Sequence, residues 1–379
     1  MKEKKAKNSF LLVTSSFPAT EDESGNAGGF VLDFALALQA RGHTVTVLTP
    51  QISRITSIQV ERFRSFTNET SLSHLVPKKT SVKLRMILLM ASGSIKILKL
   101  QKQMKFDRVL CFWALPSGLL NLPSNLISKV PMDVWLLGSD VWAAKKYPFG
   151  ERFLNAISRR SSLFLSDGNQ LSDTAFNITK RHAQFLPSGR AVRTIDPIVE
   201  SLERYILFVG RLHPNKGVDL FIRAYINCIA KTNDMPKLYI YGTGPLYEEL
   251  QAEIISSKCD QHVFLCGVLN EKDLPERMHN ALCVAIPSRI ESIPLILGQA
   301  ARYSKEVLLT NVGDMGSLAK EYQLENICEP TVESIEERLL IILKRNKPID
   351  TINLRKLSNL LSLENSVDSY LKLIQNEAE

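Results

Sequence analysis

The 379-residue sequence lacks the features that mark several classes of protein. Its six cysteines are scattered and form no Cys-x-x-Cys pair, which argues against a zinc ribbon or a disulfide framework and indicates reduced thiols. No apolar run approaches the roughly 18–20 residues that a membrane-spanning helix needs. The basic start is followed by the short apolar run Phe10–Val13 with no cleavage site, so we expect no signal peptide and a cytoplasmic protein.

Patterns that bind metals are equally scarce. The six histidines form no cluster, and no Asp-x-Asp pair occurs. No motif for nucleic-acid recognition is evident. We therefore expect no metal, no resident cofactor and no nucleic-acid partner.

Positive charge is abundant and unevenly distributed. Residues 1–190 hold 26 Lys and Arg against 13 Asp and Glu, a balance of +13, whereas residues 191–379 hold 21 against 26, a balance of −5. A basic N-terminal half suggests an anionic partner there, either a lipid surface or a phosphorylated acceptor. A basic surface that merely faces solvent is the alternative.

Residues 82–105 show apolar residues at helical spacing with Lys and Arg between them, although Gly93 offers a point where the helix could break. Such a basic amphipathic pattern has two interpretations. The segment is either a helix packed on a sheet with a solvated face, or a helix that meets an anionic membrane. The second interpretation predicts peripheral attachment to the inner face of the cell membrane.

The order of elements predicts a doubly wound α/β fold. Phe10–Thr14 is strand-like, Gly29–Arg41 is helical and Thr44–Leu48 is strand-like again, which is the rhythm of βαβ units. The first loop ends in Gly28-Gly29 at the start of a helix, where a ligand can approach the backbone. The length favours two domains, with the polar segment 190–203 as their linker.

A loop in the C-terminal half places a carboxylate beside a helix start. The buried strand Val284–Ile286 is followed by Glu291, and Pro294 opens an apolar helix. The N-terminus of a helix is a ready site for anions. A carboxylate next to such a site suits a substrate with both a diphosphate and hydroxyl groups, such as a nucleotide sugar; an ordinary βα turn is the alternative.

A second loop in the same half carries two cations. The strand that begins at Tyr205 ends at Gly210, and Arg211 and Lys216 follow in one loop. Ligands of α/β sheets bind beyond the carboxyl ends of strands. A guanidinium and an ammonium at that position can neutralise a diphosphate.

Together these stretches resemble the family 4 glycosyltransferases, retaining enzymes of GT-B fold within the glycosyl transferases group 1. The resemblance rests on Gly210-Arg211-Leu212 followed by Lys216-Gly217, and on Pro287-Ser288 followed by Glu291. The chain departs from the family pattern at two positions. Gln299 stands where a second Glu is usual, and Leu137 replaces the histidine of a His-Gly-x-Asp turn whose Gly138 and Asp140 remain.

The resemblance implies an α/β fold of two Rossmann-like doubly wound domains facing a central cleft. Residues 1–189 would form the acceptor-side domain and residues 204–350 the nucleotide-sugar-binding domain. Residues 351–379 would form C-terminal helices that cross back to the first domain.

The resemblance also implies roles for individual residues. Glu291 would hold sugar hydroxyls and stabilise the cationic sugar centre, while Arg211 and Lys216 would neutralise the departing diphosphate. Asp140 would lie on the acceptor and sugar side, with a loop cap as the alternative. The donor would be bound by Gly28, Gly29, Gly210, Val268, Ile293, Pro294, Leu295 and Gln299, with Val268 near the nucleobase and Gln299 near the ribose.

The implied activity is metal-independent transfer of a hexose, with retention, from a nucleotide-diphospho-sugar to a glycan or lipid-linked acceptor. Synthesis of cell-surface polysaccharide or lipopolysaccharide is the expected context. Two alternatives stay open at this point. The chain is a nucleotide-sugar epimerase of the same fold, or a non-catalytic paralogue that only binds the donor.

Overall fold

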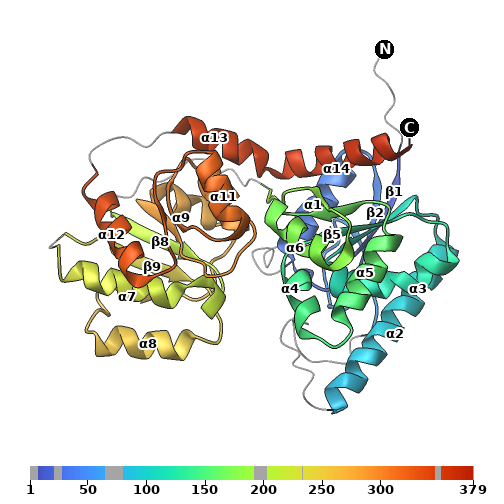
Figure 1. Cartoon of the computed structure of the whole chain (residues 1–379), viewed down its shortest axis with the longest axis horizontal. Coiled ribbons are helices and arrows are strands. Elements are labelled where there is room, and N and C mark those ends of the chain that lie inside the picture. The colour runs from blue at the N-terminus through green and yellow to red at the C-terminus, as the bar shows by residue number, and fades with distance from the viewer. Residues whose placement is uncertain are drawn as a thin grey trace. The chain divides into compact units, whose positions relative to one another are not determined.

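The computed structural model describes residues 7–20, 28–64, 80–191, 203–232, 234–345 and 351–378. The chain divides into two compact units (Figure 1). Unit 1 comprises Met1–Gly189 and Leu363–Glu379, and unit 2 comprises Arg190–Ser362. The predicted linker 190–203 lies largely outside the described residues.

Unit 1 is built on a seven-stranded parallel sheet with the order β3-β2-β1-β4-β5-β6-β7. Its central strands are buried on both faces, which explains why they do not alternate and are apolar apart from Arg108 and Asp133 near their amino ends. The strands are β1 (Ser9–Val13), β2 (Thr44–Thr49), β3 (Gln59–Arg62), β4 (Arg108–Phe112), β5 (Met132–Leu136), β6 (Phe164–Ser166) and β7 (Gln184–Phe185).

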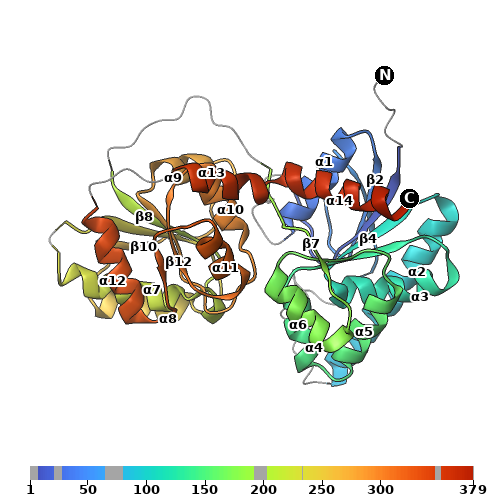
Figure 2. The ribbon, with the colours of Figure 1, turned by 45° about the horizontal axis from the view of Figure 1, so that its top comes forward.

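Helices cover both faces of this sheet. Residues of α2, α3 and α5 share one hydrophobic core, and α1 packs with α14 on the other face (Figures 1 and 2). The helices are α1 (Gly29–Ala40), α2 (Thr80–Gln103), α3 (Leu119–Ile127), α4 (Ser139–Lys146), α5 (Gly150–Arg160), α6 (Asn169–Thr179) and α14 (Leu363–Ala378), with a π-helical turn at Ala114–Gly118.

The break considered at Gly93 does not occur, because α2 is a single helix. A Cβ atom at Gly93 would lie 2.6 Å from Cδ2 of Leu120 in α3. The glycine therefore lets α2 and α3 approach closely.

Unit 2 repeats the same topology in a six-stranded parallel sheet with the order β10-β9-β8-β11-β12-β13. Its strands are β8 (Tyr205–Val209), β9 (Lys237–Tyr241), β10 (Val263–Leu265), β11 (Cys283–Ile286), β12 (Glu306–Thr310) and β13 (Ile327–Cys328). Its helices are α7 (Val218–Ile229), α8 (Tyr247–Ser256), α9 (Leu274–Asn280), α10 (Leu295–Arg302), α11 (Gly313–Glu321), α12 (Val332–Leu343) and α13 (Thr351–Leu360), with a 3-10 turn at Pro214–Lys216.

The last helix of the chain, α14, belongs to unit 1, whereas α13 belongs to unit 2 and packs on α10. Tyr370 of α14 is fully buried and donates a hydrogen bond of 2.7 Å to Oδ2 of Asp133 in β5. The same carboxylate pairs with Arg108 at the start of β4, at 2.7 and 2.9 Å. Thus the end of the chain completes the core that its beginning forms.

The predicted fold, two Rossmann-like doubly wound α/β domains, is confirmed by both strand orders. Among the residues that the structure describes, no helix is both long enough and apolar enough to cross a membrane.

Candidate functional site

The two loops singled out in the C-terminal half meet at the switch point of unit 2. Strand order runs outward from β8 through β9 on one side and from β11 through β12 on the other, and β8 pairs directly with β11. The crevice beyond the carboxyl ends of such a pair of strands is where open α/β sheets bind ligands. The loops 210–217 and 287–294 both begin there.

Lys216 and Glu291 form an ion pair between these loops, although 75 residues separate them in the chain. Their side chains are 26% and 14% exposed, respectively. The pair is therefore shielded enough to hold its position and open enough to meet a ligand. Sequence reasoning placed both residues near a phosphate and a sugar, and the structure brings their charged groups into contact.

A second ion pair clamps the same two loops and was missed from the sequence. Arg289 pairs through both terminal nitrogens with Asp219, at 2.7 and 2.6 Å. Nη1 of Arg289 also donates to the carbonyl of Pro214 at 2.7 Å, and its backbone N–H donates to that of Asn215 at 2.8 Å. Burial raises the pKa of Asp219, but the Arg289 guanidinium outweighs it and holds this pKa below its usual value.

Two glycines with left-handed backbone bring the loops together. Gly217 has φ +65°, and a Cβ atom there would lie 1.8 Å from the carbonyl oxygen of Pro287. Gly313, after β12, has φ +51°, and its Cβ would lie 1.9 Å from the carbonyl oxygen of Glu291. Any side chain at either position would push the Glu291 loop away, so these close approaches fix the backbone of that loop.

The helix start predicted beside Glu291 is present. Pro294 lies one residue before α10, in extended conformation, instead of in its first turn. The first backbone N–H groups of a helix have no partner within the helix and carry partial positive charge. Ile293 and Pro294 are buried, and Leu295 is half-buried, so this start is held by the core of unit 2.

The remaining predicted residues of unit 2 lie on segments that follow the carboxyl ends of β8, β10 and β11. Gly210 follows β8 and donates its N–H to Tyr241 at 2.9 Å, and Arg211 is exposed in the same loop. Gln299 is half-buried, four residues beyond Leu295 and hence on the same side of α10. Val268 is 61% exposed in the loop that follows β10.

Gly28, Gly29 and Asp140 lie in unit 1. Gly28 precedes α1 with φ +101°, and its carbonyl accepts the N–H of Val31 at 3.0 Å. Gly29 is buried as the first residue of that helix. Both glycines follow β1, which neighbours β4 at the switch point of the first sheet.

Asp140 is 1% exposed and joins two loops at the carboxyl edge of unit 1. Its Oδ2 accepts the N–H of Ala114 at 2.7 Å, and its Oδ1 accepts that of Leu137 at 3.3 Å. Burial raises the pKa of Asp140 to about 6, against the opposing effect of these donors. In this arrangement the carboxylate acts as a loop cap, the alternative considered from the sequence.

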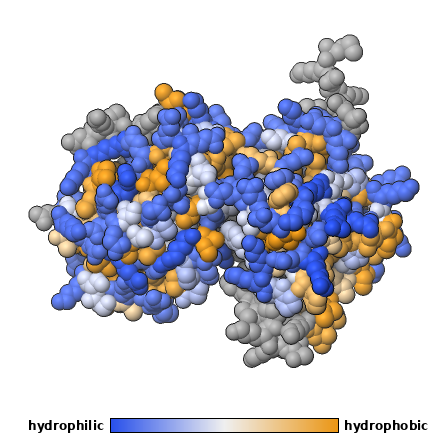
Figure 3. Space-filling view, in the orientation of Figure 1, coloured by the Kyte–Doolittle hydropathy of each residue, from blue (hydrophilic) through white to orange (hydrophobic). Residues whose placement is uncertain are grey.

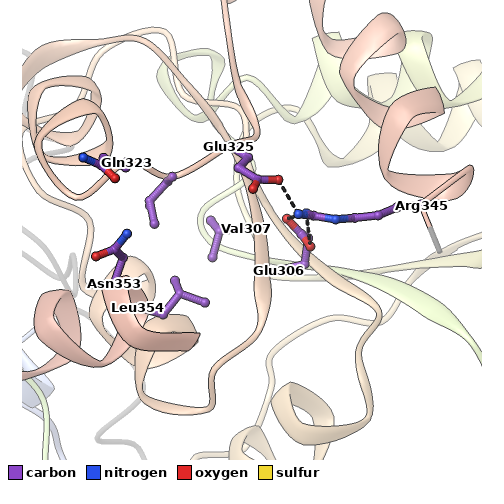
Figure 4. Close-up of a pocket in the computed structure, with 8 residues that line it drawn as sticks. Glu306, Val307, Gln323, Glu325, Arg345, Asn353 and Leu354 are labelled. Carbon is purple, nitrogen blue, oxygen red and sulfur yellow. Dashed lines mark hydrogen bonds and ion pairs between the residues drawn. The ribbon is translucent and has the colours of Figure 1, made fainter. Parts of the chain in front are cut away.

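A pocket in unit 2 lies away from these loops (Figure 4). It includes Glu306, the first residue of β12, and therefore lies at the amino edge of the sheet. Arg345 pairs there with Glu306 at 3.0 Å and with Glu325, so the charges of the pocket satisfy one another. In the described part of the chain, no group of three or more His, Cys, Asp or Glu is arranged to hold a metal ion.

Comparison with known proteins finds a related family. Residues 197–356 match the family model described as Glycosyl transferases group 1. An uncharacterized glycosyltransferase of Methanocaldococcus jannaschii is 24% identical over 56% of this chain and 58% of its own length. A putative teichuronic acid biosynthesis glycosyltransferase of Bacillus subtilis is 23% identical over 66% of this chain and 64% of its own length.

These alignments thus span less than two thirds of either relative. Over the whole chain, the structure resembles that of Anabaena HepE in complex with UDP and glucose. The TM-score is 0.75 at 14% identity, with 97% of this chain and all of that chain covered. At 14% identity, this similarity supports the fold alone.

Proposed function

We propose, from the membership of residues 197–356 in the glycosyl transferases group 1, that the chain is a retaining glycosyltransferase that uses a nucleotide-diphospho-sugar. One observation carries the proposal. Lys216, the cation that we propose binds phosphate, and Glu291, the carboxylate that we propose binds the sugar, form an ion pair at the switch point of unit 2. A donor that contains both a diphosphate and a sugar needs these two groups side by side.

The proposed chemistry follows from where charge develops. As the bond between the anomeric carbon and the diphosphate breaks, negative charge grows on the diphosphate and positive charge on the sugar. Arg211, Lys216 and the start of α10 stabilise the diphosphate, and fixed groups of this kind are a large catalytic contribution. Glu291 binds sugar hydroxyls and stabilises the cationic carbon, while the acceptor hydroxyl gives its proton to the departing diphosphate oxygen and forms the new bond to that carbon.

The ion pair suggests how donor binding frees Glu291 to bind the sugar. In the free protein Lys216 is paired with Glu291. A diphosphate is a stronger anion than the carboxylate and competes with it for the lysine. Glu291 is then released toward the sugar. The cations supply charge neutralisation, so we propose that transfer is metal-independent; chelation should leave the rate unchanged, and loss restored by Mg²⁺ or Mn²⁺ would refute this.

The proposed acceptor is a glycan or lipid-linked sugar in the synthesis of cell-surface polysaccharide or lipopolysaccharide, in the cytoplasm. The Bacillus subtilis relative, named for teichuronic acid biosynthesis, supports a polysaccharide context. The UDP and glucose of the HepE structure support a nucleotide-linked hexose as donor. Asp140 would act on the acceptor side through the loops that it holds.

Leu137 and Gln299 favour a second candidate, a paralogue that binds the donor without transferring its sugar. A thermal-shift panel of nucleotide sugars finds the donor in either case, because a bound ligand stabilises the fold by mass action. Nucleotide release is then measured with and without candidate acceptors. Release that depends on acceptor supports transfer, binding without release supports the paralogue, and conversion of donor alone to another sugar indicates an epimerase.

The role of Glu291 is tested in the same assay with Glu291→Gln. Glu248→Gln, at an exposed position of α8, is the matched control. Loss of release in the first variant alone supports the proposed site, provided that both variants melt at the wild-type temperature.

A further inference from the structure

Helix α2 presents two opposite apolar faces. Its inner face is buried at Leu89, Ile97 and Leu100 in the core of unit 1. Another apolar stripe lies about half a turn away, because each residue rotates the helix by roughly 100°. It consists of Leu84, Ile87, Leu88 and Ile95, which are 57%, 64%, 40% and 52% exposed. The fold of unit 1 explains the inner face but leaves the outer one facing solvent.

The neighbouring helix extends this surface. Helix α3 packs against α2, and at its end Leu126 and Ile127 are 58% and 73% exposed. Six of the fifteen exposed large hydrophobic residues found in the described part of the chain therefore belong to these two helices. Hydrophobic colour gathers at the lower right of Figure 3, where α2 runs along the margin of unit 1. Isolated exposed apolar residues are ordinary, but such a concentration marks an interaction surface.

The charges that α2 itself carries are of one sign. Residues 80–106 contain six Lys and Arg and no Asp or Glu. Lys96 pairs with Glu61 of β3 at 2.8 Å, whereas Arg85, Lys99, Lys102 and Lys105 are exposed. A helix face that only meets solvent normally mixes both signs, which supports the helix through pairs one turn apart.

We propose that the outer face of α2, with the end of α3, docks on an anionic lipid bilayer. The apolar stripe would enter the acyl boundary while the flanking lysines and Arg85 meet lipid phosphates, as in interfacial helices. A second copy of the chain fits less well, because two such surfaces would oppose their positive charges. This docking does not depend on the chemistry of the site in unit 2.

The direction of α2 relates this surface to the sheet of unit 1. The helix ends just before β4 begins, so its C-terminal end lies at the amino edge and its exposed N-terminal half lies toward the carboxyl edge. That edge carries the loops that follow β1, β4 and β5. The lysines near the end of α2 and the exposed end of α3 lie toward the amino edge, so the docking surface runs along the length of both helices.

Flotation of the full-length protein with vesicles tests the docking. Vesicles of phosphatidylcholine are compared with vesicles containing 30 mol% phosphatidylglycerol, at about 0.1 M and 1 M salt, where the Debye length is about 10 Å and 3 Å. We expect at least tenfold stronger partitioning to the anionic vesicles at low salt, and loss of most of that difference at high salt.

Two pairs of variants separate the apolar and electrostatic contributions. Ile87→Ser with Ile95→Ser removes the stripe, and Ile255→Ser with Ile352→Ser removes equally exposed residues of unit 2. Lys99→Gln with Lys102→Gln removes flanking charge, and Lys320→Gln with Lys344→Gln is its control. Each α2 variant should lower partitioning at least fivefold, and each control should match the wild type.

Equal binding to both kinds of vesicle, binding to neither, or unchanged binding of the stripe variant would overturn the proposal. A dimer in lipid-free solution that Ile87→Ser with Ile95→Ser dissociates would overturn it in favour of a second copy. Nucleotide release in vesicle-free solution reports on the proposed transferase separately, and the stripe variant should leave it unchanged.

Discussion

Unit 1 and unit 2 each contain an ion pair that joins neighbouring segments of a parallel sheet, but the two pairs differ in position and exposure. Arg108 and Asp133 lie at the amino ends of β4 and β5, with side chains 9% and 0% exposed. Lys216 and Glu291 lie in loops at the carboxyl ends of β8 and β11, with side chains 26% and 14% exposed.

The difference separates a pair that holds the fold from one that can exchange partners. Asp133 also accepts hydrogen bonds from Tyr370 and from the N–H of Leu163, so its oxygens are fully committed. Breaking such a pair leaves a buried charge without compensation. A partly exposed pair loses little when water or a ligand replaces one partner. Position at the carboxyl edge, more than the pairing itself, marks a candidate for ligand binding.

We expect the largest effect on ligand binding from removing both cations of the carboxyl edge. Arg211→Ala with Lys216→Ala should weaken binding of a nucleoside diphosphate by about 3–6 kcal/mol, since each hydrogen bond to a charged group contributes about 1.5–3 kcal/mol. Isothermal titration calorimetry measures the dissociation constant. Arg223→Ala with Lys231→Ala, in and just after α7, is the control. An unchanged constant would show that the diphosphate binds elsewhere.

Breaking the buried pair should instead affect stability. Arg108→Met leaves Asp133 without its cation and should destabilise unit 1 by about 3–5 kcal/mol. All three tryptophans, at positions 113, 135 and 142, lie in unit 1, so fluorescence during urea unfolding reports on that unit.

Arg223→Met breaks a pair with Glu253 that is 45% and 22% exposed, and should cost about 1 kcal/mol or less. A separate probe, such as a fluorophore attached in unit 2, follows that variant. Similar losses in the free energy of unfolding for Arg108→Met and Arg223→Met would show that the buried pair stabilises its unit no more than an exposed pair does.

Glu291→Gln keeps the size of the side chain and removes its charge. We expect transfer to slow by roughly 100-fold or more, the usual effect of removing one preorganised electrostatic group from a reaction site. The melting temperature should stay near that of the wild type, because the carboxylate is partly exposed and its loop is fixed through the backbone. Steady-state rates and a thermal melt measure both effects; full activity would refute the role of Glu291.

Gln299→Glu should give the smallest effect, a modest change in the affinity for the donor. A carboxylate at the ribose accepts from both hydroxyls, whereas the NH₂ of Gln only donates, so donor binding should tighten. The new charge also repels the diphosphate, which limits the gain to about 1 kcal/mol or less. The donor dissociation constant and the turnover rate of the wild type and of Gln299→Glu test this prediction. A large loss of affinity would contradict the placement at the ribose, and no change would indicate a repurposed site.

The sequence predicted the parts of the site that rest on local pattern. A strand, a glycine and two cations placed Arg211 and Lys216 on one loop, and a strand, a carboxylate and a proline placed Glu291 before α10. The Arg289–Asp219 clamp was not predicted, because its partners lie 70 residues apart and each alone resembles an ordinary surface charge. Asp140 was left undecided for a similar reason, since one of its partners, the N–H of Ala114, lies in a different loop 26 residues away.

The place of α14 has a consequence for biosynthesis. A ribosome synthesises all of unit 2 before it makes Leu363, yet Tyr370 fills the core of unit 1 beside Phe10 and Phe34. We therefore expect the second unit to reach its native state first, while the first waits for the end of its own chain. A released chain that ends at Ser362 should be cleaved by protease in unit 1 and resist it in unit 2. Equal resistance of both would show that the first sheet folds without its last helix.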